Sequence, residues 1–251
     1  MTDRIHALLD AAAAAQPEAP ALIEADRIVT YAEHAAATRA LSAILAGRGL
    51  GPGDRLMIVA ENGWAAAALI FAAARLGAVA VPVNARMTAP ELARIEAHST
   101  PRLVAYTLGC SPDAAGHADD APVEVTPAGA VALRSGTHGP VDSPTAATAV
   151  LLYTTGTTGD PKGVMLTHGN LIFGGRTSAI LRDMRPDDRI YGVLPVTHVF
   201  GLASMLMAAT SVGACIQFEP RFAPESLHAA LRGGVTVFPG VPQMHAVLMA
   251  H

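Results

Sequence analysis

Residues 55–83, RLMIVAENGWAAAALIFAAARLGAVAVPV, decide the fold that the sequence predicts. Leu56–Ala60 is an apolar run of strand length, and the Ala-rich run Trp64–Leu76 has the length of a helix that ends at Gly77. A second apolar run, AVAVPV, follows at once. A strand, a helix and a strand at this spacing predict a parallel βαβ unit whose strands are buried on both faces.

The alternation of helix and strand continues on both sides of this unit. Upstream, the short runs ALIEA and RIVTY predict a hairpin, and Thr30 with Glu33 predicts a capping box at a helix start. Downstream, Thr88 with Glu91 predicts a second capping box before a strand at Arg102–Tyr106. We therefore expect an α/β protein with layered αβα subdomains and mostly parallel sheets.

Residues 107–148 interrupt this rhythm, because prolines are mixed there with Gly, Asp and Ser. We expect an irregular surface segment with only short strands near Val123 and Val131. It would separate a first α/β portion, 1–106, from a second, 149–251. In the second portion the pattern predicts strands at Val150–Tyr153, Arg189–Val193 and Val235–Phe238, and helices from about Asn170 and Pro242.

Composition excludes several classes of function. The 251 residues carry a net charge of −4 and contain no Lys/Arg block, so the basic footprint of a nucleic-acid-binding protein is missing. The two cysteines are far apart and form no CxxC motif, which argues against a disulfide framework or a zinc site and favours the cytoplasm. The N-terminus has no long apolar region typical of a secretory signal.

One uncharged stretch, Val199–Phe218, is close to the length that spans a bilayer. It also contains Ser, Thr and Gln side chains and Gly213. A buried helix, a glycine stop and a short buried strand explain it equally well, and we expect no membrane span.

The most informative segment is Tyr153–Val164, YTTGTTGDPKGV, in which a buried strand leads into a loop rich in glycine and threonine. Glycines let backbone N–H groups approach an anion closely, hydroxyls donate to phosphate oxygens, and a lysine adds positive charge. The pattern predicts a triphosphate-binding loop without Walker A spacing, although a plain turn with a solvated lysine is the alternative. The candidate nucleotide-binding residues are Thr154, Thr155, Gly156, Thr157, Thr158, Gly159 and Lys162.

This loop resembles the signature of the adenylate-forming (AMP-binding) superfamily, which includes acyl-CoA synthetases, peptide-synthetase adenylation domains and luciferases. Further strings are similar to the motifs of that family and occur in its order: VTYAE (29–33), GPGDRLMIVAEN (51–62), LGAVAVPVNARMTAPEL (76–92), PVTHVFG (195–201) and FPGVP (238–242). The chain is identified on this resemblance as the N-terminal portion of such an enzyme, closest to the acyl-CoA synthetases.

The resemblance implies a reaction in two halves. A carboxylate attacks the α-phosphate of ATP to give an acyl adenylate and pyrophosphate, and a thiol, often that of coenzyme A, then takes the acyl group. By motif position, Thr154, Thr157, Thr158 and Lys162 would hold the β- and γ-phosphates, and Thr154 would also lie near Mg²⁺. His198 would sit beside the carboxylate and shape the entry to the acyl pocket; the alternative is a buried, hydrogen-bonded histidine.

The family's Tyr-Gly-x-Thr-Glu element, ribose-binding aspartate, hinge and C-terminal domain with its catalytic lysine are not found. We expect a fragment that is inactive without the C-terminal part of its own polypeptide. The apolar run Val199–Leu202 offers no acidic partner for an ammonium group, which favours fatty or aryl acids over amino acids. The alternatives are a non-catalytic nucleotide-binding or scaffolding module, and an ordinary NTP hydrolase, for which no Walker B strand end is seen.

Overall fold

The computed structural model describes residues 4–138, 147–154 and 161–251, and the strands of these ranges form two sheets. The larger sheet has, in spatial order, β6 (Val123–Thr126), β7 (Gly129–Ser135), β5 (Leu103–Thr107), β3 (Arg55–Ala60), β4 (Val79–Asn84), β8 (Thr148–Thr154) and β9 (Lys162–Thr167). The smaller sheet has β10 (Arg189–Gly192), β11 (Cys215–Phe218), β1 (Pro20–Glu24) and β2 (Arg27–Thr30).

The predicted βαβ unit is present at the centre of the larger sheet. β3 pairs in parallel with β4 and with β5, and β4 pairs in parallel with β8, while β7, β6 and β9 add antiparallel strands at the two edges. The connecting helix α3 (Trp64–Leu76) ends at Gly77, whose positive φ of 73° suits glycine. The predicted α/β class with mostly parallel sheets is confirmed.

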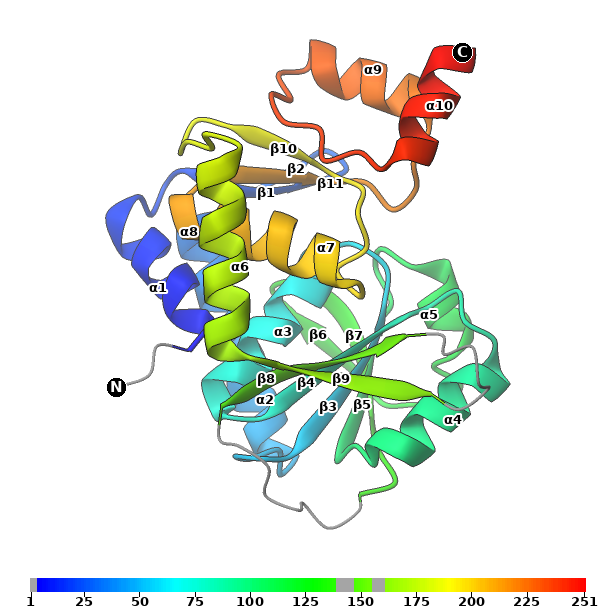
Figure 1. Cartoon of the computed structure of the whole chain (residues 1–251). Helices are drawn as coiled ribbons and strands as arrows, with labels where there is room; N and C mark the ends of the chain where they lie inside the picture. The colour runs from blue at the N-terminus through cyan, green and yellow to red at the C-terminus, as the bar shows by residue number, and fades with distance from the viewer. Residues whose placement is uncertain (1–3, 139–146, 155–160) are drawn as a thin grey trace.

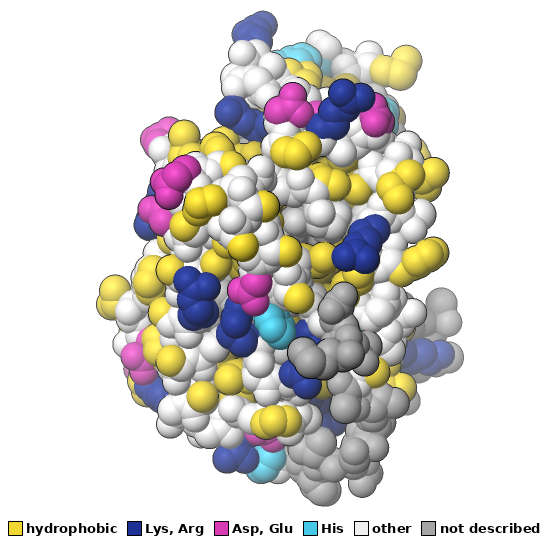
Figure 2. Space-filling model, turned by 90° about the vertical axis from the view of Figure 1, so that its left-hand side faces the viewer, with side chains coloured by type: hydrophobic (Ala, Val, Ile, Leu, Met, Phe, Trp, Pro, Cys, Tyr) yellow, Lys and Arg dark blue, Asp and Glu magenta, His cyan; other side chains and the backbone are white. Residues whose placement is uncertain are grey.

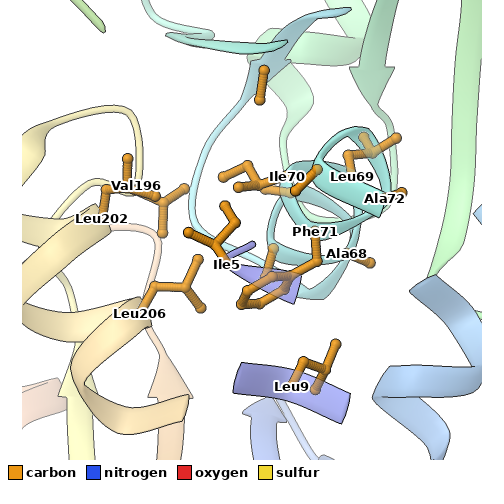
Figure 3. Packing of buried hydrophobic residues seen from close by; sticks show 14 of the residues in the cluster. Ile5, Leu9, Ala68, Leu69, Ile70, Phe71, Ala72, Val196, Leu202 and Leu206 are labelled. Carbon is orange, nitrogen blue, oxygen red and sulfur yellow. The ribbon is translucent and has the colours of Figure 1, made fainter. Parts of the chain in front are cut away.

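The position of helix α3 in the fold explains why its sequence is so rich in alanine. Every residue from Trp64 to Ala74 is buried, because the helix lies between the two sheets (Figure 1). Figure 3 shows Ile70 and Phe71 of α3 beside Ile5, with Leu206 approaching from the opposite side. Small side chains allow this close approach of backbones on several sides.

Side chains of β3 alternate between the two faces of the larger sheet. Leu56 and Ile58 belong to the core cluster around α3, and Met57 and Val59 belong to a second cluster on the opposite face. The helices packed around the first cluster are α1 (His6–Ala15), α2 (Tyr31–Gly47), α6 (His168–Leu181) and α8 (Ala208–Val212). The second cluster is covered by α4 (Ala89–Ser99) and α5 (Pro112–Gly116), and α9 (Pro224–Arg232) covers the outer face of the smaller sheet.

The structure differs from the expected division of the chain at residues 106 and 149. The strands expected near Val123 and Val131 are present as β6 and β7, but the segment also contains α5, and both strands extend the larger sheet. Val131, Ala132 and Leu133 of β7 are buried. Three of its prolines, all among the described residues, stand at the ends of elements: Pro112 begins α5, Pro122 precedes β6 and Pro127 follows it. Both sheets also combine strands from before and after this segment.

Local predictions have mixed outcomes. The β1–β2 hairpin and both capping boxes are present. Val235–Phe238 forms only an isolated bridge, between Val237 and Ile190, instead of the predicted strand; it follows Gly233 and Gly234, the latter with a positive φ of 102°. Strand β9 was not predicted. The helix expected from about Asn170 begins at His168, where Thr167 caps α6.

The uncharged stretch Val199–Phe218 is divided into several elements. They are α7 (Val199–Gly201), the π-helical turn η1 (Leu202–Met207), α8 and, after Gly213 with φ +79°, strand β11. In the described ranges, no helix combines the length and the apolar character needed to cross a membrane. On the face in Figure 2, Lys and Arg side chains are scattered among acidic and apolar ones.

Candidate functional site

A cavity of about 550 Å³ lies where the carboxyl ends of β4 and β8 meet the segment that follows β10. Ligands of open α/β sheets bind at this end of the strands. Thr154 and His198, two of the residues predicted from the sequence, both line the cavity. The other lining residues are Pro82, Val83, Asn84, Met87, Ile95, Tyr153, Leu194, Pro195, Thr197, Phe200, Gly201, Val241 and Met244.

Thr154 and Lys162 flank the predicted phosphate loop. They are the last residue of β8 and the first of β9, and they pair with each other across the antiparallel ladder. Both residues are exposed, so the hydroxyl and the ammonium are accessible to a ligand. Lys162 was expected within the loop and instead begins a strand. The candidates Thr155, Gly156, Thr157, Thr158 and Gly159 lie outside the described residues.

His198 stands at the start of α7, where its Nδ1 accepts a hydrogen bond of 3.3 Å from the backbone N–H of Phe200. With Nδ1 used as an acceptor, the proton of the neutral ring is on Nε2. The side chain is exposed, so the alternative of a buried histidine is wrong.

Gly201 lets the start of this helical segment approach the preceding chain. A Cβ atom on Gly201 would lie 2.1 Å from the carbonyl oxygen of Pro195 and 2.5 Å from that of Leu194. Real Cβ atoms do not come that close to an oxygen, so only glycine fits. Close packing at the cavity wall therefore explains why the motif PVTHVFG has a glycine at position 201.

A smaller cavity of about 210 Å³ adjoins the first and shares Asn84, Pro195, Thr197 and Met244 with it. Glu61, directly after β3, is buried beside this cavity. Its carboxylate accepts a hydrogen bond of 2.7 Å from Arg86 Nε and one of 3.0 Å from Ser111 Oγ.

Sequence reasoning gave no role to the three residues Glu61, Asn62 and Asn84. A usable signal existed, because polar residues that directly follow buried parallel strands collect at the ligand-binding edge of a sheet.

Two of the described residues carry chemical groups that suit the binding of a nucleotide with its metal ion. An exposed hydroxyl and an exposed ammonium stand at the two ends of the loop, and Thr154, which carries the hydroxyl, lines the cavity. Among the residues that the structure describes, no group of three or more His, Cys, Asp or Glu side chains could hold a metal ion. Mg²⁺ at phosphate sites keeps several waters and takes further ligands from phosphate oxygens, so the Thr154 hydroxyl could add one oxygen to that set.

Residues 9–251 match the AMP-binding enzyme family, and the chain belongs to that family. Curated relatives include a feruloyl-CoA synthase of Amycolatopsis sp, 32% identical over 94% of this chain and 48% of the relative. A sulfoacetate–CoA ligase of Cupriavidus necator is 32% identical over 98% of this chain and 51% of the relative. The chain thus spans about half the length of the curated relatives that it matches.

Solved structures agree with this assignment. Apo MatB from Rhodopseudomonas palustris superposes with a TM-score of 0.79 at 27% identity, covering 100% of this chain and 52% of that one. ATP-bound MatB from the same organism superposes with a TM-score of 0.78 at 26% identity, over 99% of this chain and 52% of that one.

Proposed function

We propose that this chain is the ATP- and acid-binding part of an acid–thiol ligase, which converts a carboxylic acid into an acyl adenylate and then into a thioester of coenzyme A. One observation carries the proposal: a single cavity is lined both by Thr154, at the edge of the phosphate loop, and by His198. A carboxylate and the phosphates of ATP would therefore meet at one place. The family membership, the CoA ligases among the relatives and the ATP-bound MatB structure support this reading.

In the proposed first step, a carboxylate oxygen of the acid bonds to the α-phosphorus of ATP, and the bond from that phosphorus to the bridging oxygen of pyrophosphate breaks. The protein's part is positioning and charge neutralisation. Thr154, Thr157, Thr158 and Lys162 would hold the β- and γ-phosphates, and the backbone at Thr155, Gly156 and Gly159 would complete the loop. Mg²⁺, when bound near Thr154, would supply further positive charge. His198 would hold the carboxylate at the entry of the cavity.

We infer a fatty or aryl acid as the substrate. His198 is the only titratable side chain other than the phenol of Tyr153 among the residues given above for the larger cavity, and the wall is otherwise dominated by Val, Ile, Leu, Met, Phe and Pro. Such a wall favours an apolar acyl group and gives no anionic partner to an amino acid's ammonium. Relatives named for ferulate, indoleacetate and long-chain fatty acids are in line with this class.

Two further parts of the proposal follow from the reaction. Because ATP and coenzyme A are the co-substrates, we place the protein in the cytoplasm. Because the matched relatives are about twice as long, the complete reaction would also need the portion that this chain does not match. A nucleotide-binding module without catalysis is the second candidate, and the exposed Thr154 and Lys162 are compatible with it.

The test is calorimetric titration of the 251-residue chain with ATP and with non-hydrolysable acyl-adenylate analogues. We expect the analogue of an apolar acid to bind more tightly than ATP alone, because it fills the cavity as well as the phosphate site. An analogue of an amino acid is the matched control and should bind more weakly. Binding of ATP without any gain from the acyl group would favour the non-catalytic module, and no binding at all would contradict both candidates.

A further inference from the structure

Asn62, two residues after the end of β3, is hydrogen-bonded to a segment that forms part of the wall of the larger cavity. Its side chain is buried, with 5% of its surface exposed. Nδ2 donates to the carbonyl oxygens of Gly192 at 2.8 Å and Leu194 at 2.9 Å, and Oδ1 accepts from the backbone N–H of Val196 at 2.9 Å. Both amide protons and the carbonyl oxygen are therefore used, and all three partners belong to one segment.

That segment, 192–198, leaves the smaller sheet at the end of β10 and runs to His198. Val193, Leu194 and Val196 are buried, so the polar backbone groups among them need partners inside the protein. In a sheet a neighbouring strand would supply these partners. Here one asparagine side chain, from 130 to 134 residues earlier in the sequence, supplies three of them.

A second contact holds the same segment from the other side. The missing side chain of Gly201 lets α7 pack against the carbonyl groups of Leu194 and Pro195, at the distances given above. The Leu194 carbonyl is thus fixed between Asn62 and Gly201. Glu61, the residue before Asn62, is buried, and its carboxylate accepts hydrogen bonds from Arg86 and Ser111, so this part of the chain is itself held in place.

We propose that Asn62 is the positioning residue of the acid-binding wall: its three hydrogen bonds fix segment 192–198 and so determine where Leu194, Thr197 and His198 border the cavity. Asn62 does not itself line the larger cavity, and it acts through this segment. The importance of the segment for acid binding rests on the proposed function, whereas the anchoring itself does not.

The chemistry of the site requires an amide at this position. Aspartate has the same shape but would place an acceptor oxygen against the carbonyl oxygens of Gly192 and Leu194. Alanine would leave the Leu194 carbonyl and the Val196 N–H without these partners, and the Gly192 carbonyl would keep only the backbone N–H of Glu219. Both substitutions should therefore free the segment while leaving the β3–β5 pairing in place.

The first measurement needs no variant. In the 251-residue chain, the side-chain amide protons of Asn62 should exchange with solvent at least tenfold more slowly than those of the exposed Asn170. Equal exchange rates would overturn the anchoring, whatever the function of the protein.

The second measurement compares Asn62→Ala and Asn62→Asp with Asn170→Ala, which removes the same amide from the cap of α6. In the two Asn62 variants we expect amide exchange at Val196 to rise at least tenfold, with β3 and β5 still protected. We also expect affinity for the apolar acyl-adenylate analogue to fall at least tenfold. Unchanged Val196 protection would overturn the anchoring, and faster exchange with unchanged affinity would overturn the role in acid binding. If the wild-type chain binds no analogue, the proposed function fails, while Val196 exchange still decides the anchoring.

Discussion

Thr154 and Lys162 lie directly opposite each other at the loop end of the β8–β9 hairpin. The ladder pairs the backbones of these two residues, so the hydroxyl and the ammonium are carried by neighbouring positions at the two ends of segment 155–161. This arrangement makes Lys162 the natural first test of the phosphate site.

Lys162 is the only lysine of the chain, which allows a direct measurement. An amine-reactive reagent should modify the exposed Lys162 in the free chain, and ATP should slow that modification by about tenfold if the ammonium is in contact with phosphate. The product is read by peptide mass spectrometry, with the N-terminal amine as the internal control. Equal labelling with and without ATP would contradict a phosphate contact.

In the proposed intact ligase, Lys162→Ala should remove about 3–4 kcal/mol of transition-state stabilisation, as the loss of a single preorganised donor does elsewhere. Lys162→Arg keeps the positive charge and should recover part of this loss. The measurement is kcat/KM for adenylate formation. A Lys162→Ala enzyme within threefold of wild type would mean that the loop is only structural.

The isolated 251-residue chain should not catalyse the reaction, because its matched relatives are about twice as long. We expect ATP–pyrophosphate exchange at background level with a panel of fatty and aryl acids. A full-length homologous ligase is the positive control. Robust exchange by the chain alone would show that the unmatched portion is not needed for adenylation.

The buried centre of the fold was predictable from sequence, and its edges were not. The β3–α3–β4 unit is buried on all sides, so its composition is uniformly apolar and its boundaries stand out. Strand β9 is an edge strand whose side chains are largely exposed, and it therefore lacks a hydrophobic pattern. The prolines of 107–148 looked like breaks in structure, whereas three of them stand at the ends of elements.

The site was predictable only where chemistry is local in sequence. Thr154 and Lys162 belong to one short string, so a pattern could indicate them. Asn62 acts on a segment more than a hundred residues away, and an asparagine after a strand is equally typical of a turn. Only the three-dimensional structure distinguishes these roles.

Gly201→Ala should destabilise the protein, because the new methyl group would overlap the carbonyl oxygens of Pro195 and Leu194. We expect a loss of about 1–3 kcal/mol in the free energy of unfolding, the usual cost of overpacking. Denaturant titration measures it. Gly169→Ala is the matched control, since a Cβ there meets no atom closer than 3.7 Å. Equal stability of the two variants would contradict the close approach at Gly201.

His198→Ala, in the intact ligase, should slow adenylation by about tenfold or more and alter acyl preference, since the side chain borders the cavity. Transfer to coenzyme A from a preformed acyl adenylate should suffer less. The two half-reactions are measured separately, with His228→Ala, an exposed histidine on α9, as the control. Loss of transfer with unchanged adenylation would place His198 in the other half of the reaction.

Two buried histidines should make stability depend on pH in the weakly acidic range. Burial lowers the pKa of His34 to about 3, and its Nδ1 accepts a hydrogen bond of 3.1 Å from Trp64 Nε1. Burial, with the nearby charges of Arg4 and His6, lowers the pKa of His168 to about 4. Both rings thus stay neutral in the folded protein at pH values where the unfolded chain, with pKa values near 6.5, takes up protons. Stability should therefore be complete above about pH 6.5 and fall as the pH is lowered toward 4, by roughly 1.4 kcal/mol per histidine for each pH unit.

The decisive comparison for this pH dependence is between two glutamine variants. His34→Gln keeps an acceptor for Trp64 but cannot titrate, so the loss of unfolding free energy between pH 7.5 and 5.5 should shrink by roughly 1.4 kcal/mol relative to wild type. Half-buried carboxyl groups such as Glu24, whose pKa burial raises, contribute equally to both proteins and cancel in the difference. His228→Gln, on the exposed face of α9, should keep the wild-type pH dependence. The unfolding free energies are measured by denaturant titration at both pH values. If His34→Gln loses as much unfolding free energy between pH 7.5 and 5.5 as His228→Gln does, the buried ring of His34 does not couple protonation to unfolding.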